Sequence, residues 1–149
     1  LVLDESVQAI GIFNFSDWGC LEEVTLPPSI KCIEHAAFCG CKNLKRVSLS
    51  DGLEIIGADS FFGCESLETI ILPATLKKIY EYALAGCGSL QEIVIQSSVT
   101  SIGDAAFGDC NNLKAIYVPK KKVDYYKKRF PADMHWLIVE DGSDLPVKP

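Results

Sequence analysis

The chain has 149 residues, of which 48% are hydrophobic and 23% are charged, and this balance excludes an intrinsically disordered protein. Its net charge is −6, and the 15 acidic and 7 basic residues of positions 1–119 make that part acidic, which disfavours non-specific binding to nucleic acid or anionic lipid. No apolar run approaches the roughly 18 residues that span a bilayer, and residues 1–5 show no signal-peptide pattern.

Apolar residues recur every 23 positions from the first residue of the chain. Each unit has the pattern Leu-x-x-Val/Ile-x-Leu/Ile/Val, and its first leucine falls at Leu21, Leu44, Leu67, Leu90 and Leu113. A fixed period of this length is the signature of a solenoid, in which each coil buries its apolar face against its neighbours. We therefore expect a partial first coil over 1–20, full coils over 21–43, 44–66, 67–89 and 90–112, and a last strand over 113–118.

Within each unit the same elements are expected in the same order. The Leu-x-x-Val-x-Leu segment predicts a short strand, because it alternates and is rich in β-branched residues. A turn follows, often with proline, and then a second short extended piece such as residues 30–33. Residues 34–38 and their equivalents predict one turn of α- or 3₁₀-helix. A tight bend follows at Gly40, Gly63 and Gly86, and at Asp109 in the last copy.

Residues 120–140 are expected to form a C-terminal cap, and residues 141–149 a loose tail. Residues 123–130 read as a short helix with Asp124 in its first turn, Lys127, Lys128 and Arg129 in its last turn, and Pro131 as its end. Residues 136–139 predict one more strand or an apolar plug. At the other end two alternatives stay open: residues 1–20 cap themselves, or further coils precede them in the complete protein.

These units resemble the leucine-rich-repeat family, and within it the bacterial surface-protein (BspA-like) type, which has 23-residue units. Residues 67–73 (LETIILP) and 101–110 (SIGDAAFGDC) carry that motif almost letter by letter, and the resemblance covers residues 1–119. It implies an α/β repeat solenoid, a right-handed coil with a parallel β-sheet on one face and turns or short helical turns on the other. It also implies a secreted or cell-surface protein that binds other macromolecules, often host matrix proteins, and brings no catalytic residues and no cofactor.

The seven cysteines and two histidines give little support to a metal or catalytic site. Four cysteines share one repeat position, which predicts a stack of buried thiols that behave as small apolar residues: Cys41, Cys64, Cys87 and Cys110. Zinc would need two close cysteine pairs or added histidines, and only His35 lies near the Cys39/Cys41 pair. His35 and His135 are in no recognisable catalytic motif, so we expect neither a metal site nor an enzyme.

The candidate binding surface is the face of the strands. The residue between the last two apolar positions of each strand is expected to point outward, and this row becomes apolar towards the C-terminal half. The row reads Thr25, Ser48, Ile71, Val94 and Tyr117, and a parallel row reads Glu23, Arg46, Thr69, Glu92 and Ala115. The binding candidates are Arg46, Ile71, Glu92, Val94 and Tyr117. The competing explanations are β-propensity alone, or cover by the C-terminal segment.

A basic cluster, Lys120 to Lys122 with Lys127 to Arg129, either contacts an acidic partner such as a glycan or is a solvated part of the cap. These features predict a non-catalytic module that binds a protein or a glycan, not nucleic acid, and has no membrane span, and the family resemblance implies that it is adhesin-like and extracellular or at the cell surface. The alternative is an intracellular scaffold or inhibitor, because seven thiols without evident pairing fit a reducing, cytoplasmic compartment. A hydrolase with a buried site is a minor alternative.

Overall fold

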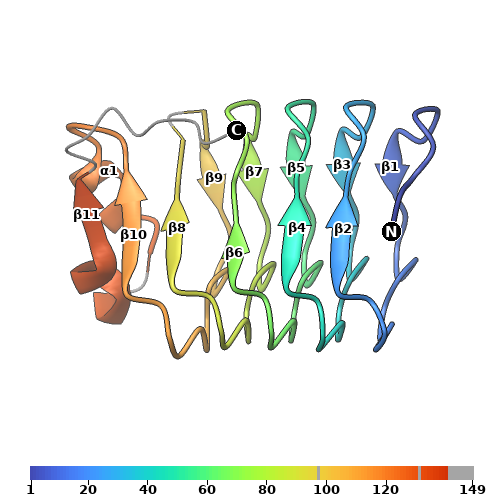
Figure 1. Cartoon of the computed structure of the whole chain (residues 1–149). Helices are drawn as coiled ribbons and strands as arrows, with labels where there is room; N and C mark the ends of the chain where they lie inside the picture. The colour runs from blue at the N-terminus through green and yellow to red at the C-terminus, as the bar shows by residue number, and fades with distance from the viewer. Residues whose placement is uncertain (97, 131, 141–149) are drawn as a thin grey trace.

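The computed structural model describes residues 1–96, 98–130 and 132–140, which wind into a solenoid of parallel strands (Figure 1). The coils contribute strands to two rows. The first row holds β2 (Glu23–Thr25), β4 (Arg46–Ser48), β6 (Thr69–Ile70), β8 (Glu92–Val94), β10 (Ala115–Val118) and β11 (Ile138–Glu140). The second row holds β1 (Ala9–Ile10), β3 (Cys32–Ile33), β5 (Ile55–Ile56), β7 (Lys78–Ile79) and β9 (Ser101–Ile102).

The strand register confirms the 23-residue period. In the first row Val24 pairs with Val47, and in the second row Ile33 pairs with Ile56. The second row is a continuous sheet in the order β1-β3-β5-β7-β9, whereas the first row is divided into the sheets β2-β4-β6 and β8-β10-β11. The prediction of one sheet faced by turns was therefore incomplete, because the short extended piece of each coil also pairs with its neighbours.

The single helical turn predicted at residues 34–38 is wrong, and the backbone shows why. One repeat position has a positive φ in every coil: Phe13 (54°), Ala36 (52°), Asp59 (53°), Tyr82 (54°) and Ala105 (50°). A left-handed residue interrupts helical hydrogen bonding, and every second N–H group of the turn points towards the next coil. Ala36 N donates to Ala58 O at 2.9 Å, Phe38 N to Ser60 O at 2.8 Å and Gly40 N to Phe62 O at 2.8 Å.

The tight bend predicted at the end of each unit is confirmed. Gly40, Gly63 and Gly86 have φ values of 71°, 68° and 73°, and Asp109 takes the same left-handed conformation at 54°. Glycine fits this position because it has no Cβ to clash with the following carbonyl, and aspartate is one of the few other residues that tolerate it. The bend turns the chain from the outer turns back towards the first strand row.

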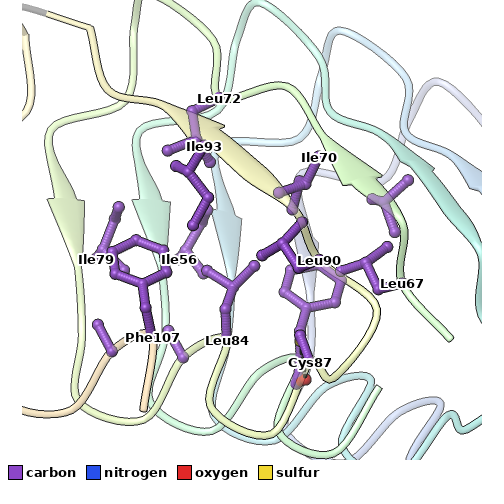
Figure 2. Close-up of a cluster of buried hydrophobic side chains, with 14 of the residues drawn as sticks. Ile56, Leu67, Ile70, Leu72, Ile79, Leu84, Cys87, Leu90, Ile93 and Phe107 are labelled. Atoms are coloured by element: carbon purple, nitrogen blue, oxygen red, sulfur yellow. Dashed lines mark hydrogen bonds between the residues drawn. The ribbon is translucent and has the colours of Figure 1, made fainter. Parts of the chain in front are cut away.

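The core lies between the two strand rows, and each repeat position adds one side chain per coil. Figure 2 shows side chains of the first row, such as Ile70 and Ile93, facing those of the second row, such as Ile56 and Ile79. Phenylalanine rings stack along the axis: Phe38 lies 5.3 Å by ring centroid from Phe61, and both are fully buried. Neighbouring coils therefore bury each other's apolar surface, as a repeat protein requires.

The described helical residues lie in the C-terminal segment, as α1 (Val123–Lys127) and the 3₁₀-helix η1 (Ala132–Leu137). This small helical content does not support the α/β description, and the fold is a parallel-strand β-solenoid. The helix predicted over 123–130 ends earlier, at Lys127. Of the two alternatives for residues 136–139, a strand or an apolar plug, the structure shows a strand, but only from residue 138: β11 covers 138–140 and pairs in parallel with β10, while 136–137 belong to η1. The predicted helix end at Pro131 and the tail at 141–149 fall outside the described residues.

Candidate binding surface

The outward position of the first strand row forms a continuous line along the solenoid. Thr25 pairs with Ser48 in the N-terminal sheet, and Val94 pairs with Tyr117 in the C-terminal sheet. Ile71 directly follows β6, between the two sheets, and 64% of its surface is exposed. Because successive strand residues point to opposite faces, the neighbours of this position turn inward: Val24, Val47, Ile70, Ile93 and Ile116 are buried.

The line is polar at one end and apolar at the other. Thr25 and Ser48 are exposed hydroxyl side chains, whereas Ile71 is exposed and Val94 and Tyr117 are half-buried. Strand β11 adds Val139, which pairs with Tyr117 and is 41% exposed. We call these four residues, Ile71, Val94, Tyr117 and Val139, the apolar row. Sequence reasoning missed Val139, because β11 follows β10 with an offset of 22 residues and has no Leu-x-x-Val-x-Leu motif.

The second line of candidates, which contains Arg46 and Glu92, is more polar than the first. Arg46 forms an ion pair with Glu23 on the neighbouring strand, and both side chains are exposed. Glu92 is exposed in the other sheet and pairs with Ala115, which lies on the same face of the sheet but is buried. The structure thus brings Val94, Tyr117 and Glu92 together in one sheet, places Ile71 at its edge, and separates Arg46 from them in the N-terminal sheet.

The stacked cysteines are buried as predicted, and their thiols are held by backbone carbonyls. The Sγ atoms of Cys64, Cys87 and Cys110 lie 3.2, 3.3 and 3.2 Å from the carbonyl oxygens of Phe38, Phe61 and Leu84, to which they donate. Burial raises the pKa of Cys110 to about 11 and raises the pKa values of Cys64 and Cys87 well above the ordinary 9.0. These thiols stay protonated near neutral pH, so they lack the thiolate that nucleophilic attack or metal binding needs.

The two histidines sit in separate places and contact backbone oxygens. His35 Nδ1 lies 3.1 Å from Ala58 O and 3.6 Å from Asp59 Oδ2, and His135 Nε2 lies 2.9 Å from Phe130 O. Among the side chains of residues 1–96, 98–130, 132 and 134–140, no three His, Cys, Asp or Glu gather where they could hold a metal ion. A shallow hollow on the first outer turn is lined by residues 14–18, which include neither histidine nor cysteine. In the described part of the chain no helix is long and apolar enough to cross a membrane.

Comparison with known families identifies the repeat. The family model for the BspA type leucine rich repeat region matches residues 2–132 in six copies. The chain belongs to the BspA-type leucine-rich-repeat family. The search of curated proteins gave no match.

Solved structures support the BspA-type assignment. A leucine-rich-repeat protein of T. pallidum shares 37% identity and a TM-score of 0.74, with 74% of this chain and 52% of that chain aligned. A leucine-rich cell surface protein of Faecalibacterium prausnitzii shares 31% identity and a TM-score of 0.78, with 83% and 33% aligned. The pneumococcal vaccine antigen PcpA, at 18% identity and a TM-score of 0.73, shares the fold over 94% of this chain and 40% of its own length. The chain spans about half or less of each of these structures.

Proposed function

We propose that this protein is a non-catalytic, surface-exposed binding module that contacts a partner protein through the apolar row. The apolar row carries the proposal, because two of its apolar side chains are exposed: Ile71, which follows β6 between the two sheets, by 64%, and Val139, on the last strand β11, by 41%. Exposed apolar rows that are rimmed by polar residues are typical of contact surfaces. Glu92 and Arg46 would supply polar contacts at the rim, as interfaces commonly do.

An extracellular or cell-surface location is part of the same proposal. It is supported by the membership in the BspA-type family and by the similarity to the F. prausnitzii protein, which is a cell surface protein. A host matrix protein is the partner class that an adhesin of this kind would bind. Immunodetection on intact and lysed cells of the source organism tests the location, and signal confined to lysed cells would contradict it.

Binding assays with two charge-matched double variants test the site. Ile71→Asp/Val139→Asp places two carboxylates in the apolar row, and Thr25→Asp/Ser48→Asp places two at equivalent positions of its polar end. Against purified collagen, laminin and fibronectin, we expect the parent and the control to bind at least one protein, and the apolar-row variant to bind it at least about tenfold more weakly. Equal loss in both variants would exclude the apolar row, and no binding by the parent would exclude these matrix proteins.

A second candidate function is an intracellular scaffold or inhibitor. It is favoured by the cysteines, since all seven are free thiols in the structure and a reducing compartment would keep them so. The same cell-fractionation experiment separates the two proposals, and thiol titration of the protein purified from its source would add a second measure. Exposed Cys20 found oxidised would favour the extracellular location.

We further propose that residues 120–140 act as the C-terminal cap of the solenoid. Strand β11 extends the first strand row past β10, and Phe130 stacks on Phe107 with ring centroids 5.7 Å apart, as one more member of the phenylalanine stack. Tyr126 is buried and donates its hydroxyl towards the carbonyl oxygens of Gln96 and Val99. These contacts cover the last coil, whose apolar face would otherwise meet water.

A further inference from the structure

The basic side chains of the C-terminal segment differ from those of the coils in what they contact. In the coils, four basic side chains bridge to a carboxylate of a neighbouring coil: Lys42 to Glu65, Lys45 to Glu22, Arg46 to Glu23 and Lys77 to Glu54. The basic cluster comprises Lys120, Lys121, Lys122, Lys127, Lys128 and Arg129. None of these six forms an ion pair with a carboxylate among the side chains that the structure describes, those of residues 1–96, 98–130, 132 and 134–140.

Two of these cations are held in place around one aromatic ring. The guanidinium carbon of Arg129 lies 3.6 Å from the centroid of the Tyr125 ring, and the Lys122 ammonium lies 5.0 Å from it. Arg129 Nη1 also donates to the carbonyl oxygen of Tyr125 at 2.9 Å. Cation–π contacts leave the outer N–H groups of both side chains available. Ordering them before binding lowers the entropy that a ligand must overcome.

We propose that the basic cluster is a second binding site and that its ligand is a linear sulfated polysaccharide. Six cations within ten residues match the repeated anionic groups of such a chain, and sulfate is recognised by lysine and arginine as other oxyanions are. This proposal does not depend on the apolar row. The basic cluster contains none of the four residues of the apolar row, so the two sites use different side chains.

The rest of the molecule argues against other polyanions. A stiff nucleic-acid duplex or a flat anionic bilayer would also approach residues 1–119, where 15 acidic residues face 7 basic ones and would repel it. Single-stranded nucleic acid usually stacks its bases on free aromatic faces, whereas the Tyr125 ring is already covered by Arg129 and Lys122. A flexible polysaccharide can reach the cluster alone.

The test compares two triple variants that remove equal charge. Lys120→Gln/Lys122→Gln/Lys128→Gln removes three exposed cations of the cluster, and Lys31→Gln/Lys78→Gln/Lys114→Gln removes three exposed cations of the coils. Each is titrated with heparin as the probe, over a range of salt, after circular dichroism and thermal unfolding show the parent fold. We expect the cluster variant to bind roughly ten- to a hundredfold more weakly and with a shallower salt dependence, and the control to stay within about twofold of the parent.

Three outcomes would overturn the proposal. The first is heparin affinity too weak to measure for the parent near physiological salt, and the second is equal weakening in both triple variants, which would indicate non-specific charge attraction. The third is single-stranded DNA, or phosphatidylserine vesicles, binding the parent as tightly as heparin, since either would make a different polyanion the ligand. The Ile71→Asp/Val139→Asp variant should bind heparin like the parent, so failure of the apolar-row proposal and of this one are told apart.

Discussion

At the scale of single residues, each repeat position has nearly the same surroundings in every coil, so the same kind of side chain fits it each time. The stacked cysteines show this well, because each thiol donates to a carbonyl of the preceding coil and lies beside the thiols of neighbouring coils. A buried polar group without a hydrogen-bond partner costs stability, and the carbonyl of the preceding coil gives each buried thiol such a partner. The position therefore accepts a small residue with a weak donor, which explains why cysteine occupies it four times, each as a free thiol.

Alkaline pH should destabilise the protein through these thiols. Burial raises the folded-state pKa of Cys64, Cys87 and Cys110 above the ordinary 9.0, so above about pH 9 the unfolded chain loses protons that the folded protein keeps. Stability is then full below pH 9 and falls as pH rises, by at most about 1.4 kcal/mol per pH unit for each such thiol. Urea unfolding under reducing conditions at about pH 8 and pH 10 measures the change.

The Cys64→Ala/Cys87→Ala variant is the control for the thiol effect. It should be less stable than the parent near pH 8, because two buried sulfur atoms are lost, but its stability should fall less between the two pH values. Tyr126, whose pKa burial also raises, contributes equally to both proteins and cancels in the comparison. Parallel losses in parent and variant would show that other groups cause the alkaline sensitivity.

Gly57 should be intolerant of any side chain. A Cβ atom at this position would lie 2.8 Å from both the carbonyl carbon of Glu34 and the carbonyl oxygen of Ile33, in the backbone of the preceding coil. Two coils would have to separate to admit it, so Gly57→Ala should lower the free energy of unfolding by about 2 kcal/mol or more. Gly19→Ala is the matched control, since a Cβ there meets no atom within 4 Å, and its effect should stay within about 0.5 kcal/mol in the same thermal or urea unfolding series. A similar small effect at Gly57 would mean that the coils adjust easily.

At the scale of elements, strands of two to four residues are stable only because they are stacked. An isolated two-residue strand such as β5 has no stability of its own, yet here it pairs on both sides, with β3 and β7. The outer turns follow the same logic, since every second N–H group there reaches a carbonyl of the next coil, while those between them bond within their own turn. Pairing between coils therefore supplies much of the hydrogen bonding that a helix or hairpin would find within itself.

Tyr126→Phe should test how firmly the C-terminal segment is attached. The hydroxyl of Tyr126 lies 3.1 Å from both Gln96 O and Val99 O, in the turn that links β8 to β9. Phenylalanine keeps the buried ring and loses only these hydrogen bonds, so the free energy of unfolding should fall by about 1–2 kcal/mol. Hydrogen exchange should accelerate most in β11 and in the turn after β8.

Tyr125→Phe is the control for this attachment. Its ring contacts Lys122 and Arg129, which phenylalanine can also do, so we expect a change within about 0.5 kcal/mol. If Tyr126→Phe behaved like this control, the C-terminal segment would be held by the Phe130 stack and by β11 without help from the hydroxyl.

The sequence predicted the elements that depend on side-chain periodicity, but its prediction of a helical outer turn was wrong because backbone conformation determines that turn. The buried positions, the strand register and the glycine bends follow from the 23-residue pattern, because a parallel stack repeats whatever one coil does. The outer turn did not follow, since Phe13, Ala36 and Tyr82 give no sign of a left-handed backbone: such residues are rarely found there. The sequence predicted the outward row as far as Tyr117. Its extension to Val139 became visible only from the pairing of β10 with β11, because β11 carries no repeat motif.

At the scale of the whole molecule, each coil contacts only its neighbours, so a core defect should matter most where it has neighbours on both sides. Phe61 is fully buried within the stack, whereas Phe15, at the same repeat position of the first coil, is only half-buried. Phe61→Ala should therefore lower the free energy of unfolding by about 3–5 kcal/mol, and Phe15→Ala by clearly less. Urea unfolding gives the two values, and hydrogen exchange shows how far each defect spreads. The Phe61 variant should lose amide protection in coils on both sides, and the Phe15 variant chiefly in the first two. Equal costs for the two substitutions would contradict the dependence on burial, and loss of amide protection in all coils of both variants would mean that the solenoid unfolds as one unit.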